Sequence, residues 1–368
     1  MSKERVLMAM SGGIDSSVAA MLLLEQGYEL IGCTFRTFDS IRESCLTKEK
    51  GCCSVDSIME AKHLAQQLGF EHHIVDFRQT FRDSVIRNFI DEYKAGRTPN
   101  PCVICNSHIK WGVLIDKARE LGCSRIATGH YARISQHNGH FYLRRAADTQ
   151  KDQTYFLWML TEDNLRQTLF PLGDLTKSKV RDIARKHGFE KLSQKRESQE
   201  ICFIPDNDYR RFLASEGCNP PSGNYLSAEG HILGHHQGYT SYTIGQRKGL
   251  GIALGEPAFV TRINATTNEV TLGHHDDLYT HTVRLRAARF SGNPERPVMA
   301  QIRYRSTPSE AKIVINQTPM TANMQPSAFA LYFTDPVWAV TPGQSCVIYQ
   351  DDLLVGAGLI DQEDYFTS

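Results

Sequence analysis

The residues best suited to chemistry form the run Ser11-Gly12-Gly13-Ile14-Asp15-Ser16-Ser17 near the N-terminus. The run follows a short apolar stretch and opens a predicted helix, so its two glycines allow a tight turn that aims backbone N–H groups at a ligand. The partial positive charge of a helix N-terminus suits phosphate, and the serine hydroxyls can donate to phosphate oxygens. Asp15 is a candidate magnesium ligand beside them. No lysine directly follows the glycines, so the run is not a Walker A loop.

Cysteines supply the second group of reactive side chains. Cys102 and Cys105 lie in Asn100-Pro101-Cys102-Val103-Ile104-Cys105-Asn106, which we expect to be a proline-stiffened loop just before a helix. A thiolate at a helix N-terminus has a lowered pKa and is a better nucleophile near neutral pH. Cys202, in Ile201-Cys202-Phe203-Ile204, is a third candidate. The sequence has no second Cys-x-x-Cys or histidine pair at matching spacing, which argues against a four-ligand zinc site. We expect small buried side chains at Cys33, Cys123, Cys218 and Cys346 and leave the vicinal pair Cys52-Cys53 unassigned.

Positive charge is concentrated between Thr176 and Arg196. This stretch contains eight Lys or Arg residues and two acidic residues, which gives a local charge of +6. Such a run can neutralise several phosphates of a nucleic acid, although a solvated helix face has the same composition. Arg303-Tyr304-Arg305, on a predicted strand, places a stacking ring between two cations, which is typical of RNA-binding surfaces.

The first half of the chain must position these groups on alternating strands and helices. Short apolar runs predict strands, and between them apolar residues recur at helical spacing. Repeated β–α units without tight hairpins predict a doubly wound parallel sheet, the α/β class. The predicted strands are 6–10, 28–36, 72–77 and 125–128, and the predicted helices are 16–25, 58–68, 81–93 and 106–121.

The pattern changes in the second half. Residues 131–145 alternate around Asn138-Gly139 and predict a hairpin, and helical patterns return at 152–160 and 177–187. From about Phe259 short strands follow one another with turns between them, which predicts a small antiparallel β-barrel or sandwich. We therefore expect three domains, with residues 1–205 carrying the parallel sheet and the cysteines, 206–275 a small central domain, and 276–368 the barrel.

Composition excludes several classes of protein. The chain has 368 residues, 41% of them hydrophobic and 22% charged, which argues against a disordered chain, a collagen-like fibre or a coiled coil. Lys and Arg total 41, as do Asp and Glu, so a nucleic-acid surface must be local. We find neither a membrane-spanning apolar run nor a secretory signal, and so expect a cytoplasmic protein, no membrane partner and reduced cysteines.

Seven ordered motifs, which together cover nearly the whole chain, resemble those of the bacterial tRNA-specific 2-thiouridylase family, within the PP-loop ATP pyrophosphatase superfamily. Besides residues 11–17 they are Ala95-Gly96-Arg97-Thr98-Pro99-Asn100-Pro101, Ala127-Thr128-Gly129-His130-Tyr131, Lys151-Asp152-Gln153, Ile201-Cys202-Phe203-Ile204, Gly245-Gln246-Arg247-Lys248-Gly249-Leu250-Gly251 and Thr341-Pro342-Gly343-Gln344.

This resemblance implies ATP-dependent 2-thiolation of the wobble uridine in tRNAs for Lys, Glu and Gln, with Mg²⁺ and with sulfur from a cysteine desulfurase or a sulfur-carrier protein. Cys105 matches the family's nucleophile and Cys202 its persulfide-bearing cysteine, and the two form a transient disulfide. The implied ATP-binding residues are Ala9, Met10, Ser11, Gly12, Gly13, Ile14, Asp15, Ser16, Phe35 and Gly129. The implied tRNA contacts are Asn100, Pro101, Cys102, His130, Lys151, Asp152, Gln153, Arg303, Tyr304 and Gln344.

One position departs from the family, whose members mostly carry Asp where this chain has Cys102. A thiol does not replace a carboxylate in acid–base chemistry. Three thiolates, from Cys102, Cys105 and Cys202, could instead hold a [4Fe–4S] cluster with one open iron, so a persulfide route and an iron–sulfur route both remain open. Another PP-loop ligase acting on a small metabolite, or a nucleotide-binding module, is the alternative outside tRNA thiolation.

Overall fold

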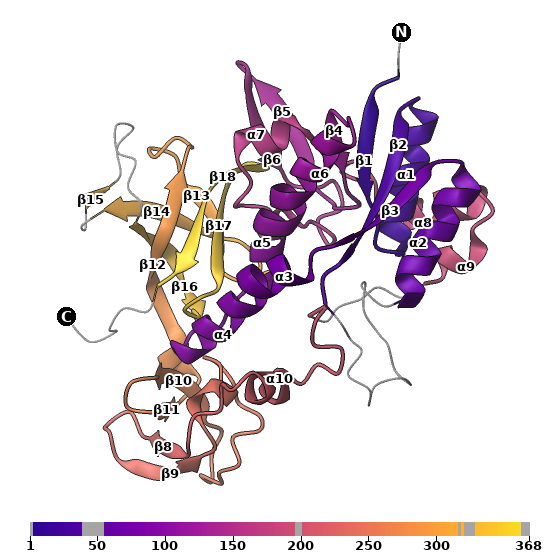
Figure 1. The fold of residues 1–368 in the computed structure, drawn as a ribbon. Coiled ribbons are helices and arrows are strands. Elements are labelled where there is room, and N and C mark those ends of the chain that lie inside the picture. The colour runs from indigo at the N-terminus through magenta and orange to yellow at the C-terminus, as the bar shows by residue number, and fades with distance from the viewer. Residues whose placement is uncertain (1–2, 39–54, 196–200, 316–317, 320–327, 362–368) are drawn as a thin grey trace. The chain divides into compact units, whose positions relative to one another are not determined.

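The computed structural model describes residues 3–38, 55–195, 201–315, 318–319 and 328–361 (Figure 1). The chain divides into two compact units. What we call the N-terminal unit consists of Met1–Ile86, Pro101–Asn207 and Asp352–Leu354, and the C-terminal unit consists of Arg87–Asn100, Asp208–Asp351 and Val355–Ser368.

A five-stranded parallel sheet is the centre of the N-terminal unit, with the order β3-β2-β1-β4-β7. Strand β1 therefore lies between the strand that follows it in the chain and a strand that comes much later, which confirms the doubly wound sheet. The strands are β1 (Arg5–Ala9), β2 (Glu29–Arg36), β3 (Glu71–Asp76), β4 (Arg125–Ala127) and β7 (Thr168–Leu169).

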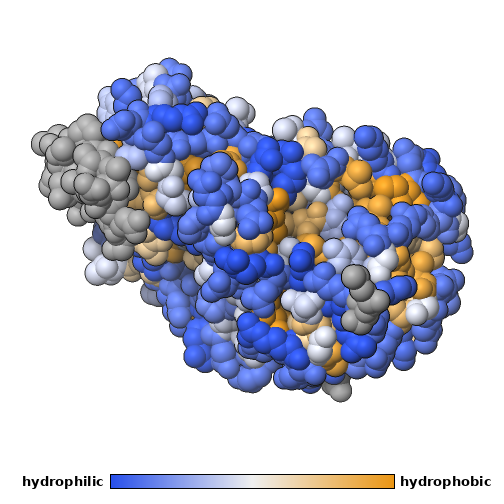
Figure 2. All heavy atoms as spheres, turned by 90° about the horizontal axis from the view of Figure 1, so that it is seen from above, coloured by the Kyte–Doolittle hydropathy of each residue, from blue (hydrophilic) through white to orange (hydrophobic). Residues whose placement is uncertain are grey.

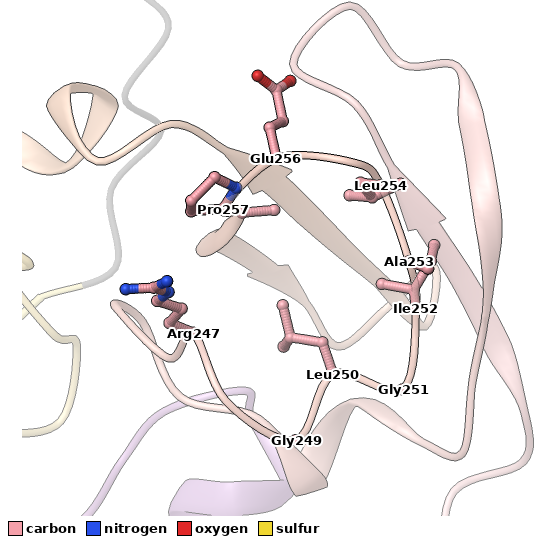
Figure 3. Close-up of a pocket in the computed structure, with 10 residues that line it drawn as sticks. Arg247, Gly249, Leu250, Gly251, Ile252, Ala253, Leu254, Glu256 and Pro257 are labelled. Atoms are coloured by element: carbon pink, nitrogen blue, oxygen red, sulfur yellow. The ribbon is translucent and has the colours of Figure 1, made fainter.

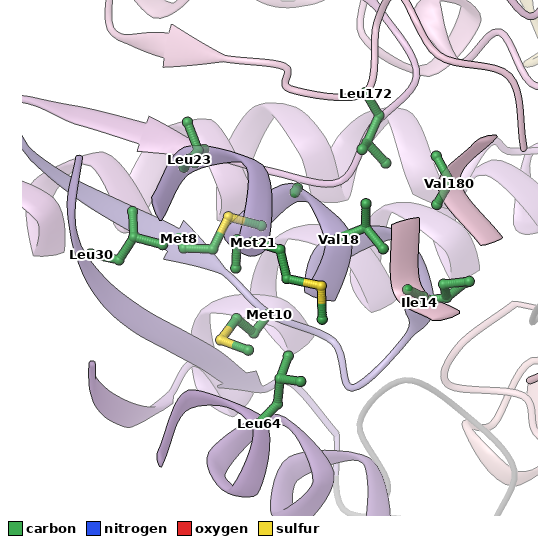
Figure 4. Packing of buried hydrophobic residues seen from close by; sticks show 14 of the residues in the cluster. Met8, Met10, Ile14, Val18, Met21, Leu23, Leu30, Leu64, Leu172 and Val180 are labelled. Carbon is green, nitrogen blue, oxygen red and sulfur yellow. The ribbon is translucent and has the colours of Figure 1, made fainter. Parts of the chain in front are cut away.

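Helix α1 (Ile14–Glu25) packs between the sheet and later helices. Eight of its residues are buried, because α2 and α8 cover the sides that the sheet leaves open. Figure 4 shows Val18 and Met21 of α1 among the side chains of Met8, Leu64 and Val180. The other helices of this unit are α2 (Val55–Leu68), α3 (Arg78–Phe81), η1 (Arg82–Ile86), α5 (Pro101–Ile104), η2 (Cys105–Val113), α6 (Leu114–Glu120), η3 (Thr154–Phe156), α7 (Glu162–Arg166), α8 (Lys177–Lys186) and α9 (Glu190–Ser193).

The helix that carries the cysteine pair begins earlier than predicted. It starts at Pro101 and continues through α5, the π-helical segment η2 and α6. Proline is well suited to a first helical position, because its missing N–H needs no partner there. The prediction of a loop at Cys102 and Cys105 is therefore wrong, since both lie within the helical segment.

Two further local predictions have different outcomes. The hairpin is confirmed as β5 (Arg133–His137) and β6 (His140–Arg144), with Asn138 and Gly139 both at positive φ in the turn. The predicted helix at 152–160 is wrong, because only η3 forms there. The Asp152 carboxylate accepts hydrogen bonds from Ala146 N at 2.8 Å and Thr154 Oγ1 at 2.7 Å, which favours a turn over a helix.

The C-terminal unit contains a four-stranded sheet with the order β10-β11-β8-β9. Its core includes Tyr225, Val260 and Val270, all fully buried. The strands are β8 (Gly223–Leu226), β9 (Ile232–His236), β10 (Phe259–Asn264) and β11 (Glu269–Gly273), and the helices of the unit are α4 (Arg87–Lys94), α10 (Tyr209–Ser215), η4 (Tyr239–Ser241) and η5 (Asp276–Leu278).

The predicted antiparallel β-barrel is also confirmed in this unit. Its strands follow the order β12-β16-β14-β13-β17-β18, and the barrel closes because β12 also pairs with β18, with Leu285 opposite Ile360. The strands are β12 (Tyr279–Phe290), β13 (Val298–Gln301), β14 (Ser309–Ile315), β16 (Phe329–Trp338), β17 (Ser345–Gln350) and β18 (Leu353–Ile360), with the short β15 (Thr318–Pro319) paired to β14.

Arg303-Tyr304-Arg305 does not lie on a strand, contrary to the prediction, because β13 ends at Gln301. The Gln301 amide donates to the carbonyls of Tyr304 at 2.7 Å and Ser306 at 3.1 Å and so closes a turn.

On the face drawn in Figure 2, hydrophilic residues form most of the surface and hydrophobic residues occupy smaller areas between them. Within the described ranges, no helix is long and apolar enough to cross a membrane.

Candidate active site

The glycine-rich run connects the end of β1 to the start of α1, and we call residues 10–17, which include the first turn of α1, the phosphate loop. It lies at the carboxyl edge of the sheet, where the strand order changes direction between β1 and β4, the usual ligand position in open α/β folds. Gly12 has φ +66°, and a Cβ there would lie 2.3 Å from the Ser57 carbonyl oxygen, so both conformation and space require glycine. Gly13 caps α1 without a side-chain hydrogen bond.

The serines of the loop make hydrogen bonds within it. The hydroxyls of Ser16 and Ser17 donate to the Gly13 carbonyl at 3.1 and 2.8 Å, and Ser11 N donates to Ser16 Oγ at 3.2 Å. These bonds fix the turn that aims the first backbone N–H groups of α1 at the loop.

Asp15, at the second position of α1, is held by two neighbours. Lys177 Nζ lies 2.8 Å from each of its carboxylate oxygens, and the Tyr131 hydroxyl donates to Oδ1 at 2.7 Å. A magnesium ion at Asp15 would have to displace the Lys177 ammonium, and the described residues contain no group of three or more His, Cys, Asp or Glu side chains able to hold a metal. Asp15 is therefore held in an ion pair in this structure, and the described residues offer no magnesium site built from three protein side chains.

Phe35, near the end of β2, and Gly129, just after β4, lie at the carboxyl ends of the two strands that flank β1. A Cβ on Gly129 would lie 2.6 Å from Ser16 N and 2.7 Å from the carbonyl carbon of Asp15, so this glycine touches the first turn of α1. Phe35, near the end of β2, lies with its ring 5.6 Å from that of Phe77. Both residues come from strand ends next to the phosphate loop, as their predicted nucleotide role requires.

Lys110 connects two predicted site residues that are far apart in sequence. Its Nζ lies 3.4 Å from His130 Nε2, while His130 Nδ1 lies 2.8 Å from Thr128 Oγ1. Desolvation, together with the Lys110 charge, holds the pKa of His130 well below its usual value, so the ring is neutral. The Lys110 charge also acts on the thiol of Cys102. Sequence reasoning missed Lys110, although it follows Cys105 by five positions, the hydrogen-bond spacing of a π-helix.

The three candidate cysteines are free thiols in the structure. Cys102 is an exposed residue, whereas Cys105 and Cys202 are half-buried. Desolvation of the Cys102 thiol raises its pKa, and Lys110 opposes that effect without cancelling it. The expectation of a lowered pKa is therefore wrong for Cys102 and stays a prediction for Cys105. Phe203, next to Cys202, packs its ring 5.7 Å from that of Phe81 in α3, a helix that contacts η2.

The remaining cysteines lie as predicted where they are described. Cys33, Cys123, Cys218 and Cys346 are buried, and burial raises the pKa of Cys33 to about 12 and that of Cys123 to about 11. Cys52-Cys53 lie outside the described residues. Because the described residues include no metal-binding group of three, Cys102, Cys105 and Cys202 do not fit an iron–sulfur site in this structure.

Two predicted tRNA contacts of the N-terminal unit, Asp152 and Gln153, make hydrogen bonds that fix the backbone around them. Gln153 Oε1 accepts from Tyr131 N, and Gln153 N donates to the Tyr131 carbonyl, each at 2.9 Å. Asp152 is buried and fixes the turn before it, whereas Lys151 is half-buried. Asp152 and Gln153 thus have a positioning function in the structure, whatever they contact in RNA.

The predicted tRNA contacts of the C-terminal unit also have structural partners. The Arg303 guanidinium donates to the carbonyls of Ala339 at 2.6 Å and Ile244 at 3.2 Å. Gln344 Nε2 donates to the carbonyls of Thr98 and Pro99 at 2.9 and 3.0 Å, just before Asn100 and Pro101. Tyr304 is half-buried in the turn after β13.

A loop within residues 247–258, which shares Arg247 and residues 249–251 with the motif Gly245–Gly251, lines a pocket of about 410 Å³ in the C-terminal unit (Figure 3). The Leu250 side chain points into the ring of the loop, and the Leu250 carbonyl accepts a hydrogen bond from the buried Tyr225 hydroxyl at 2.6 Å. Arg247 and Glu256 supply the charged groups of its lining. This loop is therefore built on the core of the four-stranded sheet.

The basic run at 176–196 is partly a solvated face, because Lys179, Arg185, Lys186 and Lys191 are exposed. Lys177 contacts Asp15, and Lys195 Nζ donates to the Gly12 carbonyl at 3.0 Å and pairs with Glu60. Arg196 lies outside the described residues. Two of the eight cations therefore belong to the phosphate loop, a placement that sequence spacing gave no sign of.

Comparison with known proteins covers nearly the whole chain. Residues 4–206 match the family model described as "tRNA methyl transferase HUP domain", 210–283 the "tRNA methyl transferase PRC-barrel domain", and 278–360 the "Aminomethyltransferase beta-barrel domain". The tRNA-specific 2-thiouridylase MnmA of Amoebophilus asiaticus is 46% identical over 98% of this chain and 96% of its own length. The protein of the same name from Clostridium perfringens is 43% identical over 98% and 99% of the two chains.

Solved structures resemble the chain only weakly. A 4-thiouridine synthetase–RNA complex with bound ATP covers 58% of this chain and 50% of that chain, at 16% identity and a TM-score of 0.35, which is too low to support an argument. The sequence relatives are decisive instead, because they match at more than 40% identity from end to end. The chain belongs to the tRNA-specific 2-thiouridylase family.

Proposed function

We propose that this protein is a sulfurtransferase that replaces the C2 oxygen of the wobble uridine in tRNAs for Lys, Glu and Gln with sulfur, using ATP. Two lines of support converge on this function. Relatives that are 43–46% identical over nearly the whole chain carry the name tRNA-specific 2-thiouridylase. The first half of the chain also has a phosphate loop at the ligand-binding edge of a parallel sheet, where ATP is expected.

The observation that carries the proposal is a series of contacts from the phosphate loop to the cysteine helix. Gly129 lies against the first turn of α1, and the next residue, His130, contacts Lys110. The Lys110 charge in turn acts on the thiol of Cys102, at the start of the helical segment that also bears Cys105. We infer that the activated base binds between these groups, where it can meet both ATP and a thiol.

The first step supplies a leaving group. The uridine C2 carbonyl is a poor electrophile, so its oxygen attacks the α-phosphorus of ATP, the bond to the β-phosphate oxygen breaks, and pyrophosphate leaves. C2 is then bonded to an adenylated oxygen and is open to attack by sulfur. The base must leave the anticodon stack to reach the site, as in other enzymes that modify bases.

The second step transfers sulfur from a persulfide on Cys202. The terminal persulfide sulfur attacks C2, and the Cys105 thiolate then attacks Cys202 Sγ. The sulfur–sulfur bond of the persulfide breaks, its electron pair stays with the transferred sulfur, AMP leaves, and a Cys105–Cys202 disulfide forms. A thiol reductant returns both cysteines to thiols, and a cysteine desulfurase or sulfur-carrier protein supplies the next sulfur. Phe203 supports this pairing, because it packs on α3, which contacts the π-helical segment η2 that begins at Cys105.

Cys102 does not take the acid–base role of the carboxylate that the family resemblance places at this position. Desolvation raises the pKa of its thiol, which makes it a poor base and a poor nucleophile near neutral pH. The described residues form no group of three His, Cys, Asp or Glu side chains able to hold a metal, so the iron–sulfur route has no assembled ligand set in this structure. We therefore derive no step through a cluster or through magnesium.

Pyrophosphate release, measured with and without unmodified tRNA, tests the function. We expect release to depend on tRNA that has an unmodified wobble uridine, with a tRNA whose wobble base is cytidine as the control. Release that is equally fast without tRNA would instead support a ligase that acts on a small metabolite. Iron analysis after anaerobic purification gives an independent check, since about four irons per chain would reinstate the cluster route.

Nucleoside analysis of tRNA tests the cysteine roles. We expect Cys105→Ala and Cys202→Ala each to abolish 2-thiouridine in cells that lack another source of it. Cys123→Ala is the matched control, because this cysteine is buried in the same unit and its raised pKa keeps it a thiol. Normal 2-thiouridine in both active-site variants would refute the assigned roles.

A further inference from the structure

Two lysines from opposite ends of the α8–α9 segment lie against the phosphate loop. Lys177 is the first residue of α8, and its Nζ lies 2.8 Å from both carboxylate oxygens of Asp15. Lys195 follows α9, and its Nζ donates to the Gly12 carbonyl at 3.0 Å. The fold thus brings two ammonium groups to a loop that lies more than 160 positions away in the chain.

The surroundings of Lys177 hold its ammonium in one place. The side chain is only 11% exposed, against 30% for Asp15. Tyr131 orients the same carboxylate through its hydroxyl, and the Lys177 ammonium lies 5.7 Å from the centre of the Tyr131 ring. Lys177 N donates to Asp148 Oδ2 at 2.9 Å, which fixes the start of α8. A lysine buried to this extent requires an anionic partner, and here the partner is itself part of the nucleotide loop.

The loop needs such a cation, because its own residues provide none. From Ala9 to Ser17 the single ionisable side chain is Asp15, an acid. Loops that bind a triphosphate commonly include a lysine that reaches the β- and γ-phosphates. Pyrophosphate gains negative charge as it leaves, and a fixed cation beside it stabilises the transition state.

We propose that Lys177 binds the β- and γ-phosphates of ATP and stabilises the departing pyrophosphate, and that Asp15, with Tyr131, positions its ammonium at the loop. Asp15 is then a positioning residue for Lys177 rather than a metal ligand. This inference rests on the proposed ATP-dependent function, since it assigns a role within the adenylation step. It removes Lys177 from the RNA-binding surface that the basic run suggests.

ATP affinity of the full-length protein tests the inference, measured by calorimetry with a non-hydrolysable ATP analogue. We expect Lys177→Met to weaken affinity about 10- to 100-fold, the size of a lost charge-assisted hydrogen bond, and Lys177→Arg to recover most of it. Lys179→Met is the matched control, because Lys179 lies on the same helix and is exposed. Unchanged affinity in Lys177→Met, or equal losses in Lys177→Met and Lys179→Met, would overturn the proposal. If Lys177→Met does not fold, the affinity of Lys177→Gln for the analogue is compared with that of Lys177→Arg. We expect weaker binding in Lys177→Gln, and equal affinities would overturn the proposal.

A double variant separates phosphate binding from simple neutralisation of Asp15. If Lys177 served only to neutralise that carboxylate, Asp15→Asn combined with Lys177→Met would restore affinity for the analogue. We expect the double variant to stay at least as weak as Lys177→Met, and restoration would overturn the proposal. Failure of the proposed function is distinguishable, because pyrophosphate release by the unaltered protein would then be independent of tRNA, while analogue affinity would still report on Lys177.

Discussion

The ammonium of Lys110 lies 3.4 Å from Nε2 of His130, which joins the cysteine helix to the segment that follows β4. The Lys110 charge thereby acts on two titratable groups, the His130 ring, whose charged form is a cation, and the Cys102 thiol, whose charged form is an anion. It helps to keep the His130 ring neutral, because a second positive charge nearby is unfavourable. It also favours the thiolate of Cys102, although desolvation dominates and raises the pKa of that thiol. Both effects predict how the site responds when the charge is removed.

Replacing Lys110 by Met should slow alkylation of Cys102. Loss of the positive charge raises the pKa of this thiol further, so a smaller fraction is thiolate at any pH below that pKa. We expect the iodoacetamide rate at Cys102 to fall about three- to tenfold near neutral pH, the effect of one nearby charge. Mass spectrometry of the peptide that contains Cys102 measures the rate. Lys117→Met is the control, since it removes a lysine from the same helical segment, and an unchanged rate in Lys110→Met would contradict the prediction.

Gly129→Ala should weaken ATP binding by displacing the first turn of α1. The new Cβ would lie 2.6 Å from Ser16 N, and backbone cannot move away as a flexible side chain can. We expect a loss of about 1–3 kcal/mol in the free energy of unfolding together with weaker binding of an ATP analogue. Thermal unfolding and calorimetry measure the two effects. Gly112→Ala is the matched control, because its Cβ would make an ordinary 3.5 Å contact, and equal behaviour of the two variants would refute the steric argument.

The features that sequence reasoning predicted correctly depend on local patterns. Strand and helix spacing around the glycine-rich run is enough to place the phosphate loop at the carboxyl edge of a parallel sheet. The hairpin at Asn138-Gly139 has a turn sequence that allows few other structures. Glycine at position 129 could be related to the nucleotide only through the family motif, because the contact with Ser16 joins residues far apart in the chain.

The predictions that failed depend on long-range partners or on competing hydrogen bonds. The sequence places Lys177 in a run of basic residues that favours a charged surface. In the fold Lys177 contacts Asp15, which lies 162 positions away in the chain. Asp152 lies in a helical pattern, but its carboxylate binds backbone and hydroxyl groups that fix a turn. Arg303 lies in a predicted strand, but β13 ends at Gln301 and the guanidinium binds the carbonyls of Ala339 and Ile244, while its contact with tRNA stays a prediction.

Arg303→Met should therefore destabilise the C-terminal unit before any effect on RNA binding is considered. The substitution removes the donors for two carbonyl groups, and buried acceptors left without a partner cost about 1–3 kcal/mol each. We expect a lower midpoint of urea unfolding, followed by fluorescence of Trp338, whose ring the guanidinium approaches at 6.0 Å. Arg305→Met, at an exposed position of the same turn, should leave the midpoint unchanged. A midpoint for Arg303→Met equal to that of the control would show that these bonds contribute nothing to stability.

His72 should make the N-terminal unit sensitive to mild acid. Desolvation, with the charges of His73 and Lys62, lowers the pKa of His72 to about 4, whereas an unfolded histidine titrates near 6.5. The unfolded state therefore binds a proton first, and the free energy of unfolding should fall as pH decreases from about 6.5 towards 4. His72→Gln, which can still bond to Thr34, should flatten this slope in urea unfolding, whereas His63→Gln, at an exposed position, should keep it. An identical slope in both variants would exclude His72 as its source.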